Sequence, residues 1–157
     1  MKKLELSDWA SIAEVIGAIA VVVSLIYVGF QISANTAEIR ASNRQHLINR
    51  SGEATLTAAS NPQLAKALIK AAAGEPLSSD EYAQYSYFVR GMQYDIQEAY
   101  LLFIEDRLDE SYWRTRAAIF MAYMQSSSAR EVYSRDRELG VLHPEFVVWA
   151  DHAMREL

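Results

Sequence analysis

The chain has 157 residues, a formal net charge of −5 and no cysteine. This length accommodates one domain with a hydrophobic core, but not two domains in addition to a membrane span. The absence of cysteine excludes disulfides, thiolate metal ligands and cysteine nucleophiles. The charge is dispersed and mildly acidic, whereas nucleic-acid binding requires a concentrated basic face, so we expect no nucleic-acid partner.

The first predicted element is an apolar stretch, residues 9–32, which carries no charge from Val15 to Phe30. As a helix it spans about 35 Å, enough to cross a hydrocarbon core of about 30 Å. Trp9 and Tyr27 lie where interfacial aromatic residues are expected. The sequence therefore predicts a transmembrane helix. The alternatives are a cleavable signal peptide, which normally has a basic leader and a shorter apolar core, and a buried core helix.

One face of this predicted helix carries small or polar side chains at spacings of three and four. The face, which we name the oligomer seam, comprises Ala13, Gly17, Ala20, Ser24, Tyr27 and Gln31. Lipid provides no hydrophobic drive for helix pairing, so close approach through small residues is the usual means of association. The same phase continues beyond the span through Ala34, Glu38, Ala41, Gln45 and Ile48. We therefore expect an unbroken helix that forms a homo-oligomer.

The orientation of the span is set by basic residues close to its ends. Lys2 and Lys3 precede the span, whereas Arg40, Arg44 and Arg50 follow it. The two sides are nearly balanced, and a short leader is easy to translocate. We therefore expect the C-terminal domain to be cytoplasmic.

The remaining residues show helical patterns only. Residues 34–60 contain no proline and predict a juxtamembrane helix that continues the span. Signals for five further helices follow at Asn61-Pro62, Ser79, Asp109-Glu110, the serine run 126–128 and His143-Pro144. The clearest of these helices runs from Ser79 to about Arg107, with the apolar stripe Tyr85, Val89, Met92, Ile96, Ala99 and Phe103.

These elements predict an all-α fold in three parts. Residues 1–33 form a leader and transmembrane helix, residues 34–60 a juxtamembrane helix, and residues 61–157 a small helical bundle. The short loops between the helices imply antiparallel neighbours.

Catalytic and metal-binding patterns are weak throughout. His46, His143 and His152 lack metal-ligand spacing, and His143 is most simply a helix cap. The acidic cluster Glu105, Asp106, Asp109 and Glu110 lacks the spacing of a calcium loop, and is expected to close one helix and start the next. We therefore expect no metal and no cofactor.

Three carboxylates are possible polar sites. Glu14 lies inside the apolar span, where it can reach the headgroup layer or face a partner helix. Asp95 and Glu98 share a helix with Arg90 and Tyr94 at spacings that permit contact. A surface ion pair is the simplest interpretation, whereas a buried, paired carboxylate would indicate a site.

Three segments of the sequence are similar to those of one protein family. They are residues 19–32 (IAVVVSLIYVGFQI) followed by Asn35-Thr36, residues 60–65 (SNPQLA), and residues 97–100 (QEAY) with Leu108-Asp109-Glu110 and Trp113. With these segments the chain resembles a family of short bacterial membrane proteins with one N-terminal transmembrane helix and a C-terminal helical domain. The resemblance implies a bacterial inner-membrane location and assigns no functional residue.

The favoured interpretation is a non-enzymatic, membrane-anchored module that self-associates and scaffolds or regulates a membrane complex. Its expected partners are further copies of itself, membrane lipids and another membrane protein. One alternative is an oligomeric pore or transport subunit in which Glu14, Ser24 and Gln31 line a central path. A second is an enzyme that uses Asp95 and Glu98.

Overall fold

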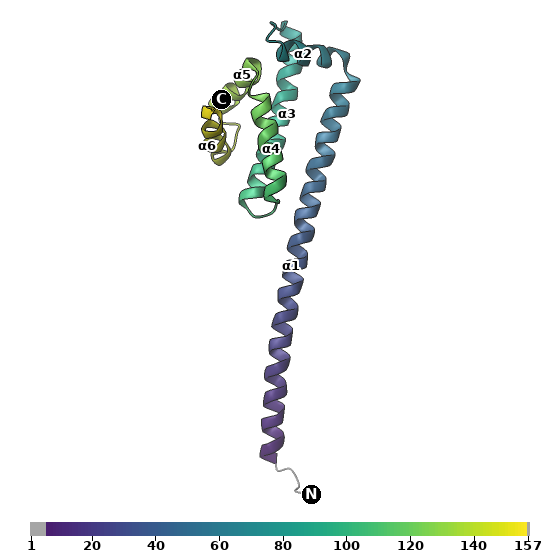
Figure 1. Ribbon diagram of the computed structural model, residues 1–157, viewed down its shortest axis with the longest axis vertical. Helices are drawn as coiled ribbons and strands as arrows, with labels where there is room; N and C mark the ends of the chain where they lie inside the picture. The colour runs from purple at the N-terminus through teal and green to yellow at the C-terminus, as the bar shows by residue number, and fades with distance from the viewer. Residues whose placement is uncertain (1–5, 157) are drawn as a thin grey trace. The chain divides into compact units, whose positions relative to one another are not determined.

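The computed structural model describes residues 6–156, and the regular structure in this range is entirely helical (Figure 1). The elements are α1 (Leu6–Ser60), α2 (Pro62–Ala72), α3 (Ser79–Ile104), α4 (Glu110–Tyr123), α5 (Ser127–Glu138), α6 (Pro144–Ala153) and the short 3-10 helix η1 (Met154–Glu156). The predicted all-α class is confirmed for the described residues. Lys2 and Lys3, on which the orientation prediction depends, lie outside them.

The chain divides into two compact units, Met1–Ile39 and Arg40–Leu157, and the division falls inside α1. The predicted juxtamembrane helix 34–60 is therefore shared between the units. Among the described residues, α1 contains the one stretch that is long and apolar enough to cross a membrane, and none of its most apolar part is buried. Core helices of soluble proteins and signal sequences have the same length and composition, so both alternatives stay open.

Capping side chains determine where helices of the C-terminal unit begin. The Asn61 carboxamide oxygen accepts hydrogen bonds from the backbone N–H groups of Gln63 and Leu64, both at 3.1 Å. Pro62 occupies the first position of α2, where its missing N–H is not needed. The side chain of His143 caps α6 in the same way. Both helix starts were predicted, and both are confirmed.

The start of α3 differs from the prediction by one position, because Ser78 and not Ser79 is the cap. Ser78 Oγ accepts the backbone N–H of Glu81 at 3.3 Å, and Glu81 Oε2 accepts the backbone N–H of Ser78 at 2.9 Å. This reciprocal pair is a capping box. Lys70 donates a further hydrogen bond to Glu81 Oε2 at 2.7 Å. The bonds from Lys70 and Ser78 lower the pKa of Glu81 to about 2.

Several helices end with a residue of positive φ. Gly74 (φ 71°) follows α2 and Gly140 (φ 67°) follows α5, as expected for a conformation that a Cβ disfavours. After α3 the residue is Asp106 (φ 58°). The chain reverses there through a hydrogen bond of 2.8 Å from Arg107 N to Leu102 O, so α3 ends earlier than predicted. Asp106 thus occupies a position where glycine is the usual residue.

The core of the C-terminal unit is built around α3, which contacts α2, α4, α5 and α6 (Figure 1). Aromatic rings from α3, α4 and α6 fill one part of it, with neighbouring ring centroids 4.8–6.0 Å apart. They belong to Tyr100, Trp113, Phe120, Phe146 and Trp149. Such edge-to-face and offset contacts stabilise a core beyond the area that the rings bury.

The buried face of α3 corrects one predicted position. Tyr85, Val89, Ile96 and Ala99 are buried as expected, but Gln93 and not Met92 completes the stripe. The Gln93 side chain is 1% exposed, and neither atom of its amide group has a hydrogen-bond partner among the described residues. The sequence pattern assigned Met92 to the core because it is apolar, and the helix geometry places its polar neighbour there instead.

Candidate functional site

Within the C-terminal unit, α1 presents one face to α3 and α4. The residues of this face recur every three or four positions, as helical geometry requires. They are Arg40, Asn43, Arg44, Leu47, Arg50 and Ser51. Leu47 is fully buried and the others are half-buried. Polar and charged groups therefore make most of this contact.

The first part of the contact lies at the turn between α3 and α4. Arg40 donates to the Asp106 carboxylate and, through Nε, to the Asp106 backbone oxygen at 3.1 Å. Asn43 Nδ2 donates to the backbone oxygen of Arg107 at 3.0 Å. Arg44 forms an ion pair with the carboxylate of Asp109. Arg40 and Asn43 thus satisfy two backbone carbonyl groups of the turn, those of Asp106 and Arg107.

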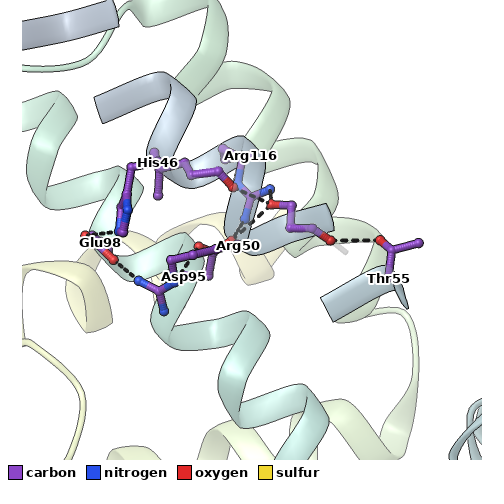
Figure 2. Close-up of polar contacts among 8 residues, drawn as sticks. His46, Arg50, Thr55, Asp95, Glu98 and Arg116 are labelled. Atoms are coloured by element: carbon purple, nitrogen blue, oxygen red, sulfur yellow. Dashed lines mark hydrogen bonds and ion pairs between the residues drawn. The ribbon is translucent and has the colours of Figure 1, made fainter. Parts of the chain in front are cut away.

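Asp95 lies at the centre of the contact (Figure 2). Its Oδ2 accepts a hydrogen bond from the Arg116 guanidinium of α4, and its Oδ1 lies 3.6 Å from Arg50 Nε of α1. Arg116 also donates to Ser51 Oγ at 2.8 Å. Arg50 pairs in addition with Glu98. One carboxylate thus receives guanidinium groups from two different helices and ties α1, α3 and α4 together.

The electrostatics of this centre follow from its burial. Burial lowers the pKa of the Arg116 guanidinium, because removal from water disfavours the charged form. Two atoms remain without hydrogen-bond partners among the described residues, Asp95 Oδ1 and Arg116 Nε. The network is therefore paired in charge but incompletely satisfied in hydrogen bonding.

A further polar contact involves His46 Nε2, which lies 3.7 Å from Glu98 Oε1 (Figure 2). The His46 side chain is exposed. The polar residues of α3 that were predicted to contact one another have different partners in the structure. Asp95 and Glu98 share Arg50, whereas Arg90 turns to α5 and donates two hydrogen bonds, at 2.7 and 2.8 Å, to the buried carboxylate of Asp136.

Sequence reasoning missed Arg116, Asp136 and the pairing of Arg50. Arg116 and Asp136 are buried charged residues, with nothing local in the sequence to distinguish them from surface charges. Arg50 was used only as a basic residue flanking the span. Partners for these groups are distant in sequence, so no spacing rule within one helix identifies them.

The predicted residues of the N-terminal unit lie on α1, and every one of them is exposed. They are Ala13, Glu14, Gly17, Ala20, Ser24, Tyr27 and Gln31. The Ser24 hydroxyl donates to the backbone oxygen of Ala20 at 2.8 Å, so this side chain is satisfied within its own helix. The exposed seam is compatible with close approach of another helix, because Gly17 has open space around its Cα.

The chemistry that this centre supports is adhesion between helices. Asp95 is buried and lies between two guanidinium groups, so it lacks the access to a substrate that a general base needs. Across the described residues, no group of three histidine, cysteine or acidic side chains is placed to hold a metal ion. No protein-family model, curated protein or solved structure matches the chain.

Proposed function

We propose that the protein is a membrane-anchored, non-enzymatic helical module that associates with copies of itself through the oligomer seam. Its C-terminal unit would then scaffold or regulate a membrane complex. One observation carries the proposal, namely that the side chains in the seam phase of α1 are exposed in each unit taken by itself. A face of small residues left free along a helix is the kind of surface through which membrane helices pair.

The C-terminal unit supports this proposal because it uses a different face of α1. Leu47 and Arg50 point into the contact with α3 and α4, whereas Ala41, Gln45 and Ile48 are exposed. Docking of the domain and association through the seam therefore do not compete for the same side chains. A helix of this kind can carry its domain and pair with another copy at the same time.

The apolar side chains of the N-terminal unit support membrane insertion. Large residues such as Ile16, Val22, Leu25 and Phe30 are more than half exposed. Contiguous apolar surfaces of this kind are rare in water and are covered by lipid or a partner. We infer a single-pass protein of the bacterial inner membrane with a cytoplasmic C-terminal domain, in which residues 61–157 form a small antiparallel bundle. Lipids and another membrane protein complete its expected partners.

The test is the mass of the full-length protein in nanodiscs, measured for Gly17→Leu and for Gly29→Leu. Both glycines have open space around the added side chain, so neither substitution is strained within the chain. Gly17 belongs to the seam, and Gly29 lies about 160° around the helix from the seam residue Tyr27. We expect the first variant to lose the oligomer and the second to keep it.

Equal oligomer masses for the two variants would contradict the seam, and a monomeric parent protein would mean that the small face serves a different protein. The intact mass of the membrane-extracted chain addresses the signal-peptide alternative in the same experiment. A chain that retains residues 1–33 is anchored by them, whereas loss of about 30 residues would show cleavage.

A further inference from the structure

The contact between α1 and the rest of the C-terminal unit is unusually poor in apolar groups. Of residues 40–60, all of which the structure describes, Leu47 alone is fully buried. The helix instead contributes Arg40, Arg44 and Arg50, which pair with carboxylates of α3 and of the turn between α3 and α4. Helices that pack permanently usually bury a continuous apolar stripe.

The backbone of the facing turn supports an electrostatic role for this contact. Asp106 holds a left-handed conformation that glycine adopts at the ends of α2 and α5. Its carboxylate is 86% exposed and accepts from Arg40. An aspartate in this conformation has a higher backbone energy than glycine, but it places a negative charge opposite α1, which glycine would not do.

Packing is also incomplete where α1 passes the middle of α3. A pocket of about 250 Å³, open to solvent, lies between the two helices and is lined by Arg50, Ala54 and Thr57 on α1 and by Phe88, Gly91 and Met92 on α3. A Cβ added at Gly91 would meet nothing within 4 Å. Separation of α1 from α3 at this level therefore forfeits few van der Waals contacts.

We propose that residues 40–54 of α1 form an electrostatic latch, a segment that releases as one piece from α3 and α4 when its charges are screened. The pairs of Arg40, Arg44 and Arg50 are partly exposed, so mobile ions weaken them together. The pair between Asp95 and Arg116 joins α3 to α4 directly and is 5% and 4% exposed, so mobile ions screen it less than the pairs of α1. The domain thus stays folded while its hold on α1 opens.

The latch lies within the C-terminal unit and does not depend on self-association of the span. It makes the coupling between helix and domain adjustable, because a change in ionic conditions alters several pairs at once. A contact built from leucines would lack this property, since hydrophobic burial does not weaken when charges are screened.

Distances between spin labels test the latch in the full-length protein in nanodiscs. The chain has no native cysteine, so Ser42→Cys on α1 and Ser134→Cys on α5 carry the only labels. Both serines are exposed. Labelled chains are diluted with unlabelled ones to suppress distances between copies. Salt is raised from about 0.1 M to about 1 M, which shortens the screening length from about 10 Å to about 3 Å.

We expect a second, longer distance whose fraction rises at least about threefold over this salt range. Arg44→Ala should raise the same fraction about two- to fivefold at low salt. The matched control is Arg114→Ala, which removes an exposed pair with Glu110 inside α4 and should leave the distances unchanged. A second label pair, Ser111→Cys with Ser134→Cys, reports on α4 and α5 and should also remain constant.

Two results would overturn the latch. One is a single Ser42 to Ser134 distance that neither salt nor Arg44→Ala alters, which would show a rigid contact. The other is a simultaneous change in the Ser111 to Ser134 distance, which would show melting of the domain and not release of α1. The oligomer mass of the same samples is read separately, so failure of the seam and failure of the latch are distinguishable.

Discussion

Asp95 of α3 and Arg116 of α4 form an ion pair whose side chains are 5% and 4% exposed. Transfer of two charges out of water is costly, and their mutual attraction repays this only when the geometry and hydrogen bonding are good. Here Asp95 Oδ1 and Arg116 Nε lack hydrogen-bond partners in the described residues. We therefore expect the pair to specify that α3 packs against α4, and to add little to the free energy of unfolding.

Removal of one member of this pair should lower the free energy of unfolding much more than removal of both members. Arg116→Met leaves Asp95 without its principal partner and should lower the free energy of unfolding by about 3–5 kcal/mol. The double variant with Asp95→Leu leaves no unpaired charge and should recover most of this loss. The measurement is denaturant unfolding in detergent, followed by fluorescence of the packed Trp113 and Trp149.

The exposed pair of Arg114 and Glu110 on α4 provides the control. Its loss in Arg114→Ala should change the free energy of unfolding by less than about 1 kcal/mol. If the double variant proves as unstable as Arg116→Met, the buried pair contributes net stability and the interpretation above is wrong.

Gln93 offers a substitution that should stabilise the protein. Its amide is buried without hydrogen bonds, so Gln93→Leu removes a desolvation penalty and adds apolar contact. We expect the free energy of unfolding to rise by about 1–2 kcal/mol. The control is Gln97→Leu, one turn later in α3. Gln97 Oε1 accepts the backbone N–H of His143 at 2.7 Å, so loss of this bond should lower the free energy of unfolding. Destabilisation by Gln93→Leu would reveal a polar partner, such as a buried water.

The capping box of α3 should make stability depend on pH in the acid range. The pKa of Glu81 falls from 4.5 to about 2 on folding, chiefly through Lys70 and the Ser78 backbone. A carboxyl with a lowered pKa contributes stability above its unfolded value and loses it as pH falls through the folded value. The contribution of Glu81 is therefore complete above pH 4.5 and disappears towards pH 2.

Comparison of Glu81→Gln with the parent protein isolates this contribution. The variant should be less stable at neutral pH, and the difference should shrink as pH falls between those values. Lys70→Gln should shrink the acid dependence more than Lys66→Gln does, because Lys70 donates the hydrogen bond and Lys66 lies 3.7 Å away. Melting temperatures at a series of pH values supply the data, and parallel curves for all variants would refute the assignment.

The pore alternative makes a separate prediction for Glu14. If the span only anchors and associates, planar bilayers containing the protein should remain silent, with or without Glu14→Ala. Ser24 supports this expectation, because its hydroxyl is already bonded to Ala20 within the helix. A conductance that vanishes on Glu14→Ala would favour the pore and displace the scaffold interpretation.

Local signals in the sequence predicted most of the helix limits. Asn61 with Pro62 and His143 with Pro144 mark starts that depend only on neighbouring residues, and both lie where expected. The predicted cap of α3 was one residue too late, because Ser79 has the same side chain as Ser78. Ser78 is the cap because Glu81 lies three residues after it, which is the position that a capping box requires. Met92 and Gln93 are adjacent and differ by one step of rotation around α3. Which of them faces the core depends on how the surrounding helices pack, and a hydrophobicity pattern contains no information on that packing.

The polar centre was only half predictable. Asp95 and Glu98 were candidates because they share a helix with possible partners. Their shared partner Arg50 comes instead from α1, and Asp95 has its principal partner, Arg116, on α4. Arg40 and Arg44 resembled charges that flank a membrane span, and the same residues form pairs with the turn after α3. A long-range pair of this kind depends on the tertiary arrangement, which no spacing within one segment encodes.

The left-handed Asp106 has a consequence for protein engineering. By local rules Asp106→Gly is an improvement, since it relieves the backbone at a helix end where glycine is favoured. The same change deletes the carboxylate that meets Arg40. Replacement of Asp106 by glycine should therefore relieve backbone strain at the end of α3 and weaken the contact between this turn and α1. Asp106→Asn, which tolerates the conformation without the charge, would separate the two effects.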